Sequence, residues 1–139
     1  MYTMDSLNEL SVGCLPGHLG ILVTHIGVWE LVAELPGRPG LMTANGFLHA
    51  GSVVTLADTC PGYGCRANLP DGASGFTTVE LKSNHLGMAR GSTLVGGAMA
   101  AHSGRSTQVW DAVVTHKERG HTLALFRCTR RVLYPPRGA

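Results

Sequence analysis

Residues 45–59 read NGFLHAGSVVTLADT, and this stretch contains the strongest helical pattern of the chain. Apolar residues recur in it at the spacing i, i+3, i+4 and i+7, on Ala50, Val53, Val54 and Ala57. Side chains at this spacing lie on one face of an α-helix. The pattern predicts a helix that begins near residues 50–52 and runs toward Arg66. A kink or an early end is expected at Pro61, because proline removes a backbone donor.

Strand-like runs fill most of the sequence outside this helix. One precedes it, at residues 28–34, and four follow it, at residues 76–86, 92–101, 106–116 and 121–134. Their alternating side chains and the glycine-containing turns between them are typical of an antiparallel meander. We therefore expect residues 1–139 to form a single α+β domain, with residues 1–25 as an N-terminal extension packed on the core.

Composition limits the classes of partner. Only 14% of the residues are charged, against about 25% in an average soluble domain. So few charges predict that copies of the chain cover part of its surface. One helix can cover only one face of the sheet, which leaves the other face or an edge for a second subunit. The net charge of +2 is too small to indicate a nucleic-acid-binding protein.

The sequence also predicts where the protein resides and that it needs no metal. It contains no apolar run of about 18 residues, so no membrane partner is expected. Residues 1–5 lack the basic and apolar regions of a signal peptide, which predicts a cytoplasmic protein. Its four cysteines are then expected to stay reduced. Neither a C-x-x-C nor an H-x-x-x-H pair is present, and we predict no metal site.

Asp58 is the carboxylate of the otherwise nearly uncharged predicted helix. The simplest interpretation places it on the solvated side of an amphipathic helix. The lack of other charges around it indicates instead a carboxylate with few partners. Burial would raise the pKa of such a group toward the range useful to a general base or a nucleophile.

Small residues mark the predicted start of the helix, at Ala50, Gly51 and Ser52. They allow a ligand to approach the backbone, and free N–H groups at a helix N-terminus favour negative charge. Such groups could stabilise the oxyanion of an acyl-transfer transition state. Gly51 and Ser52 could equally form an ordinary helix cap. A carboxylate two turns further along the same helix favours the catalytic interpretation.

Residues 45–59 resemble the N-G-x-x-H-G-G-x-x-x-x-L-A-D-T signature of hotdog-fold acyl-CoA thioesterases. Within that family the chain is similar to the phenylacetate-pathway (PaaI-type) and 4-hydroxybenzoyl-CoA thioesterase branch. The resemblance continues through residues 77–86 and resumes at residues 102–106, which are similar to the family's H-x-G-R-S/T turn. It implies a hotdog fold, in which a five- to six-stranded antiparallel sheet wraps around one long central helix.

The resemblance also implies an active site at the subunit interface of a homodimer or homotetramer. The positions that it implies for catalysis are Asp58, Ala50, Gly51, Asn45, His49 and Thr78. Asp58 matches the helix carboxylate, and either Ala50 or Gly51 matches the oxyanion donor. Asn45 and His49 match polar positions of the preceding loop, and Thr78 matches a residue that holds the water or the acyl group. Ala50 departs from the family, which has glycine there.

Further positions are assigned to the coenzyme A part of the substrate. They are Thr77, Arg90, Gly104, Arg105 and Ser106. The last three match the turn that contacts the CoA phosphates in the family. Three arginines near the C-terminus, Arg127, Arg130 and Arg131, could also bind phosphate, but a solvated strand end is the preferred interpretation.

The implied activity is hydrolysis of a small aryl- or acyl-CoA to the free acid and CoA, with no cofactor besides the CoA of the substrate. A thiol has a pKa near ~8.5, so the thiolate leaves without a strong general acid. Asp58 would either attack the carbonyl carbon or activate water. Two alternatives stay open. One is a hotdog enoyl-CoA hydratase or dehydratase, for which His49 is the nearest histidine, and the other is a non-catalytic acyl-CoA-binding protein.

Overall fold

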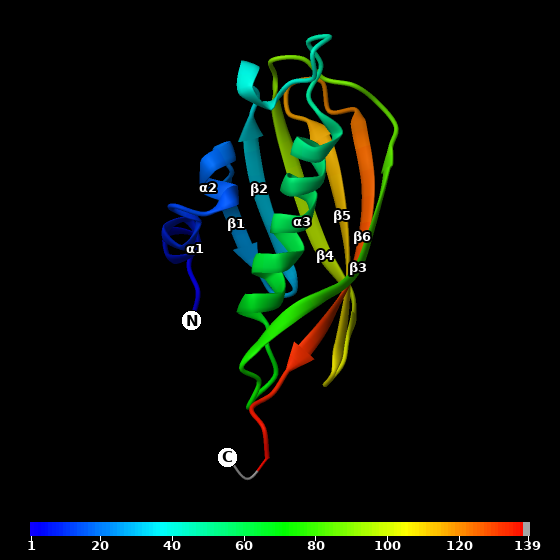
Figure 1. The fold of residues 1–139 in the computed structure, drawn as a ribbon. Coiled ribbons are helices and arrows are strands. Elements are labelled where there is room, and N and C mark those ends of the chain that lie inside the picture. Colours follow the sequence, from blue (N-terminus) through cyan, green and yellow to red (C-terminus); the bar gives the residue numbers. More distant parts are fainter. Residues whose placement is uncertain (138–139) are drawn as a thin grey trace.

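The computed structural model describes residues 1–137 and contains one antiparallel sheet curved around a long helix, α3 (Ala50–Ala67). In the order β1-β2-β4-β5-β6-β3, the strands are Leu22–Gly27, Glu30–Pro36, Thr93–Ser103, Thr107–His116, Thr122–Leu133 and Gly75–His85. Figure 1 shows α3 along the concave face of the sheet, with two short helices, α1 (Met4–Ser11) and α2 (Leu15–Leu19), beside β1. The predicted α+β architecture is confirmed.

Helix α3 begins where the sequence predicts, but the early end expected at Pro61 is wrong. The helix continues to Ala67 because its apolar face is buried against the sheet, where Leu56 and Cys60 have no exposed surface. A proline inside a helix costs about 3 kcal/mol. Burial of a leucine-sized side chain contributes about 1.5–3 kcal/mol, so one or two such side chains offset that cost.

The C-terminal half of α3 is fixed to the sheet by a close packing contact and by two consecutive hydrogen bonds. A Cβ atom at Gly64 would lie 2.6 Å from the ring of Trp110, so only glycine allows the helix to approach this closely. Nε1 of Trp110 donates to Oε1 of Gln108 at 2.9 Å, and Nε2 of Gln108 donates to the carbonyl oxygen of Asn68 at 2.9 Å. These buried bonds position the end of the helix against β5.

Strand β3 does not continue the meander that the sequence predicts. Strands β4, β5 and β6 are joined as a meander, but β3 pairs with β6, from Gly75↔Leu133 to His85↔Ala124, and ends the sheet. The chain therefore passes β6 and β5 before it enters β4. The two edges of the sheet are β1 and β3.

The N-terminal residues form structure that the sequence patterns do not predict. Helix α1 begins with a capping box between Thr3 and Ser6. Its Leu7 has no exposed surface, and the hydroxyl groups of Ser11 and Tyr63 lie 2.7 Å apart, which joins α1 to α3. Strand β1 follows and adds a sixth strand to the five that the alternating patterns predict, within the five- to six-stranded sheet that the resemblance implies.

The face of the sheet that is turned away from α3 carries exposed apolar side chains. Met99, Val113 and Leu125 are 64%, 39% and 47% exposed. Val113 lies directly opposite Leu125 in the β5–β6 pair.

No helix within residues 1–137 is long and apolar enough to span a bilayer.

Candidate active site

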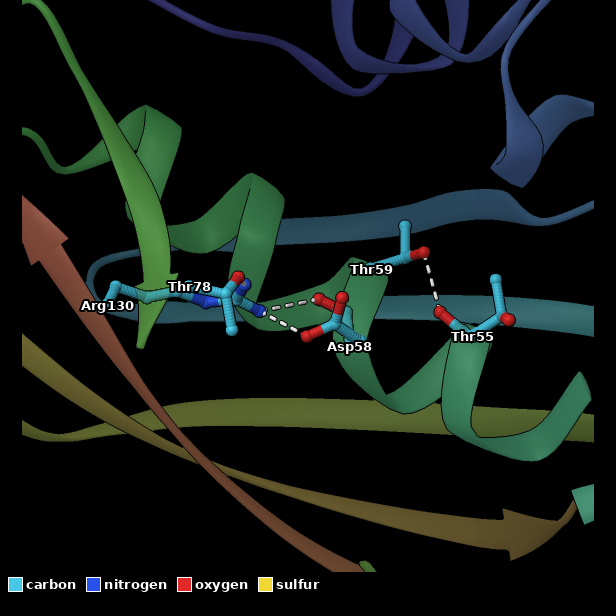
Figure 2. A network of polar contacts seen from close by, with 5 residues as sticks. All are labelled: Thr55, Asp58, Thr59, Thr78 and Arg130. Carbon is cyan, nitrogen blue, oxygen red and sulfur yellow. Dashed lines mark hydrogen bonds and ion pairs between the residues drawn. The ribbon is translucent and has the colours of Figure 1, made fainter. Parts of the chain in front are cut away.

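Asp58 on α3 and Arg130 on β6 form an ion pair. Nη2 of Arg130 donates to Oδ1 of Asp58 at 2.6 Å and to the main-chain carbonyl oxygen of Asp58 at 3.0 Å (Figure 2). The side chain of Arg130 is 2% exposed, whereas that of Asp58 is 36% exposed. Among the described residues, Arg130 is the one side chain that donates to Asp58. Its Oδ2 accepts no hydrogen bond from the described residues, and this oxygen is available for chemistry.

Thr78 belongs to the same cluster. A shift in the β3–β6 register directly after Thr78 interrupts the alternation, and Thr78 lies opposite Arg130. Nη1 of Arg130 donates to Oγ1 of Thr78. The structure thus brings Thr78 near Asp58, and the arginine connects them. Thr77 pairs with the exposed Arg131 and belongs to the opposite face of the sheet.

Arg130 is the residue of this cluster that sequence reasoning missed. Its interpretation as part of a solvated strand end is wrong, because β6 alternates and Arg130 occupies an inward position. Its inward neighbours Cys128 and Val132 are 0% and 4% exposed, whereas Arg127 and Arg131 point outward. An arginine at an inward position of an alternating strand is the signal that could have identified it.

Three buried thiols lie around the ion pair. Burial raises the pKa of Cys60 to about 12, and the negative charge of Asp58 adds to this effect. Burial likewise raises the pKa of Cys65 and of Cys128 to about 11. These thiols are neutral near pH 7, so they do not supply a thiolate nucleophile. In the part of the chain that the structure describes, no three His, Cys, Asp or Glu side chains gather closely enough to hold a metal ion.

The start of α3 has one occupied and one free N–H group. His49 is the N-cap residue, and its Nδ1 accepts a hydrogen bond from the N–H of Gly51 at 2.7 Å. The N–H of Ala50 has no acceptor among residues 1–137. Of the two candidate oxyanion donors, the geometry therefore leaves Ala50 as the available one. Because Nδ1 of His49 is an acceptor, the proton of the neutral ring is on Nε2.

A cavity of about 250 Å³ opens beside Ala50. Asn45 and His85 are among the residues that line it. The guanidinium of Arg90 lies over the ring of Phe47, 4.3 Å from its centroid, and so borders the same loop. The structure therefore gathers Asn45, Ala50 and Arg90 at the His85 end of β3.

The turn Gly104–Ser106 lies at the other end of α3. Gly104 and Arg105 line a cavity of about 500 Å³ together with residues 67–71, which follow the end of the helix. The guanidinium of Arg105 lies 5.0 Å from the centroid of the Tyr134 ring. An α-helix rises about 1.5 Å per residue, so the length of α3 separates this turn from Ala50 by about 27 Å. A single chain does not bring the turn to the helix start.

Comparison with known proteins identifies the family. The family model described as the thioesterase superfamily matches residues 45–122, which include α3, the loop before it and β3. The chain belongs to the thioesterase superfamily. This membership confirms the resemblance found in residues 45–59 and the prediction of a thioester hydrolase.

Relatives of known name cover nearly the whole chain. The proofreading thioesterase EntH of Cronobacter sakazakii is 30% identical over 131 residues, 94% of each protein. The 1,4-dihydroxy-2-naphthoyl-CoA hydrolase of Escherichia coli is 30% identical over 134 residues, 94% of this chain and 95% of that protein. A solved thioesterase from Haemophilus influenzae matches with a TM-score of 0.91 at 26% identity, over 100% of this chain and 96% of that one.

The fold of the PaaI protein from the E. coli phenylacetic acid degradation operon is also similar. It matches with a TM-score of 0.77 at 24% identity, over 85% of this chain and 83% of that one. The hotdog fold predicted from the sequence is therefore confirmed.

Proposed function

We propose that this thioesterase hydrolyses a small aryl- or acyl-CoA to the free acid and CoA, at a site shared by two copies of the chain. No cofactor is required besides the CoA of the substrate. The observation that carries the proposal is the pair of groups on α3, the half-exposed carboxylate of Asp58 and the free N–H of Ala50. The E. coli relative named as a naphthoyl-CoA hydrolase supports an aryl-CoA as the substrate.

Oδ2 of Asp58 is the reactive oxygen, since Oδ1 is held by Arg130. It either attacks the thioester carbon or takes a proton from a water molecule that attacks. The carbonyl oxygen then gains negative charge, which the N–H of Ala50 stabilises, and removal of such a donor typically costs ~2.7–4 kcal/mol. The C–S bond breaks and its electron pair leaves on the CoA sulfur. If Asp58 attacks directly, water hydrolyses the resulting acyl–Asp58 anhydride.

Asp58 and Ala50 of one chain cannot act on the same carbonyl group. They are eight residues apart on α3, which is about 12 Å along the helix axis. A nucleophile and an oxyanion donor that each lie about 3 Å from the reacting group are separated by at most about 7 Å, and a base that acts through one water by at most about 10 Å. A second copy of the chain must therefore supply one of the two groups, and a homodimer is the smallest active unit.

Strand β3 offers the surface for that second copy. It has 11 residues, it ends the sheet, and most of its side chains are exposed, including Val79 at 60% and Leu81 at 44%. A long, exposed edge strand is a template for pairing with another chain. Antiparallel pairing of two β3 strands about a two-fold axis would join the two sheets and bring the two α3 helices side by side in opposite directions.

The same pairing assembles the remaining groups. The helix start lies at the His85 end of β3, whereas the Gly104–Ser106 turn leads into β5 at the Gly75 end. Antiparallel pairing places the His85 end of one copy beside the Gly75 end of the other. The turn of one copy then approaches the helix start of its partner, where Arg90 adds a second positive charge for the CoA phosphates. The exposed apolar face of β4–β6 is the surface on which two dimers would form a tetramer.

The first experiment is a thiol-release assay on a panel of aryl-, short- and medium-chain acyl-CoA substrates. The proposal expects release from at least one class, and a loss of at least about 100-fold in Asp58→Asn, which removes the base or nucleophile. Unchanged release in that variant would contradict it. Water addition to an enoyl-CoA without thiol release would support the hydratase instead, and binding without any turnover would support the non-catalytic protein.

A further inference from the structure

We infer that Arg130 is a positioning residue of the active site: it holds Oδ1 of Asp58, so that Oδ2 alone is presented to the substrate. The inference rests on the proposed function for the meaning of Asp58. The contact itself is a property of the structure (Figure 2).

Arg130 grips Asp58 at two points. The same Nη2 donates to the side-chain oxygen Oδ1 and to the main-chain carbonyl oxygen of Asp58, so it restricts how the carboxylate can rotate. Nη1 is held by Thr78 from β3, and the guanidinium carbon lies 5.6 Å from the centroid of the Phe76 ring. The guanidinium is thus fixed by β3 and α3 together, and the carboxylate takes its orientation from a rigid partner.

The burial of the pair is unequal, which favours a role in the site over a purely structural one. Arg130 is 2% exposed and Asp58 is 36% exposed, so the cation is inside and the carboxylate faces out. Nε of Arg130 is buried and has no hydrogen-bond partner within residues 1–137. A buried ion pair is often no more stabilising than apolar residues of the same volume. A buried guanidinium with an unpaired N–H is therefore not explained by a contribution to stability alone.

Arg130 also sets the charge around Asp58. It is the one cationic side chain that the described structure pairs with this carboxylate. The other titratable groups near Asp58 are the thiols of Cys60 on α3 and Cys128 on β6, whose pKa values burial raises to about 12 and about 11. Both are neutral at the pH of an assay, and Thr78 does not titrate. Removal of the guanidinium would therefore leave the carboxylate without a compensating charge.

The chain contains a matched control pair. Nε and Nη2 of Arg127 donate to Asp111 at 2.5 and 2.8 Å, but these side chains are 61% and 45% exposed and lie on the face away from α3. Arg127→Gln therefore breaks an exposed arginine–aspartate pair whose arginine lies on the same strand, β6, as Arg130, and it leaves Asp58 untouched.

The experiment compares Arg130→Gln, Arg130→Lys and Arg127→Gln with the wild-type protein. Two properties are measured: kcat and KM for an acyl-CoA, and the chemical shift of the Asp58 side-chain carbon in NMR at one fixed pH, assigned by its loss in Asp58→Asn. Arg130→Gln is expected to lower kcat about tenfold or more with little change in KM, and to move the Asp58 signal because the hydrogen bond to Oδ1 is lost. Arg127→Gln is expected to change neither. Wild-type kcat or an unmoved Asp58 signal in folded Arg130→Gln would overturn the inference.

Arg130→Lys keeps the charge but loses the planar fork, whose Nη2 holds Asp58 and whose Nη1 holds Thr78. It is expected to lower kcat about tenfold or more and to change KM little. If Arg130→Gln does not fold, this variant decides, and wild-type kcat in Arg130→Lys would overturn the inference. The NMR signal is independent of turnover. A protein that releases no thiol from any acyl-CoA would refute the proposed function, whatever the NMR signal shows.

Discussion

Asp58→Asn should destabilise the fold as well as abolish hydrolysis, because it leaves the charge of Arg130 buried and unpaired. Removal of one partner from a buried ion pair costs about 3–5 kcal/mol. The side chain of Asp58 is 36% exposed and asparagine keeps one acceptor oxygen, so we expect a smaller loss of about 2–3 kcal/mol. In a domain of this size 1 kcal/mol corresponds to about 3–4 °C, which gives a fall in Tm of about 6–12 °C.

The assay is thermal unfolding at fixed protein concentration, in a double-mutant cycle with Arg130→Gln. The double variant no longer contains a buried charge, and it should recover at least half of the stability that Asp58→Asn loses. Asp111→Asn breaks the exposed pair with Arg127 and should cost no more than about 1 kcal/mol. A Tm of Asp58→Asn within about 2 °C of the wild type, below 1 kcal/mol on the same scale, would refute the reasoning. Strictly additive losses in the double variant would do the same.

Three further predictions concern the buried cysteines, the packing of α3 against Trp110 and the Gly104–Ser106 turn. A thiol reagent should label one cysteine per native chain, the exposed Cys14, and four after unfolding, because the other three thiols are buried; fast labelling of two or more native thiols would contradict this burial. Gly64→Ala should lower the free energy of unfolding by about 1–3 kcal/mol through overpacking against Trp110, whereas Gly97→Ala, with no atom within 4 Å of the new methyl group, is the control in thermal unfolding. Arg105→Ala should raise KM for acyl-CoA far more than it lowers kcat, since phosphate binding is the same in ground and transition states; an equal loss with a pantetheine thioester, which lacks the nucleotide, would remove its assignment to phosphate.

Local patterns predict the elements whose side chains repeat regularly. The apolar stripe of α3 and the alternation in β4–β6 depend on neighbouring residues, so the sequence shows them. Strand β1 escapes prediction because its register shifts between Val23 and His25 and interrupts the alternation. The early end of α3 at Pro61 is predicted wrongly because the sequence shows only the local cost of proline. The burial that offsets this cost depends on tertiary packing.

Contacts between distant segments are the part that the sequence does not predict. Arg130 and Asp58 are 72 residues apart, so the sequence pattern around either residue does not indicate the contact between them. The pairing of β3 with β6 is likewise non-local, because alternation selects a face of a strand and not its neighbour. The sequence therefore places Asp58 correctly on the helix but does not predict the buried cation that binds it. The resemblance to a family identifies the candidate residues. The structure then distinguishes the two oxyanion donors, because the N–H of Gly51 binds His49 whereas that of Ala50 is free among the described residues.

Complementation between two inactive variants tests the shared site most directly. Asp58→Asn removes the carboxylate, and Ala50→Pro removes the free N–H at the first position of α3, where proline is tolerated. In a two-fold dimer of the two variants, one site contains an intact Ala50 and an intact Asp58, and the other contains neither. Random pairing makes half of the dimers mixed, so co-expression should restore about a quarter of wild-type activity, and tag-purified mixed dimers about half. Mixed dimers no more active than either parent, or a fully active monomer in light scattering, would contradict the shared site.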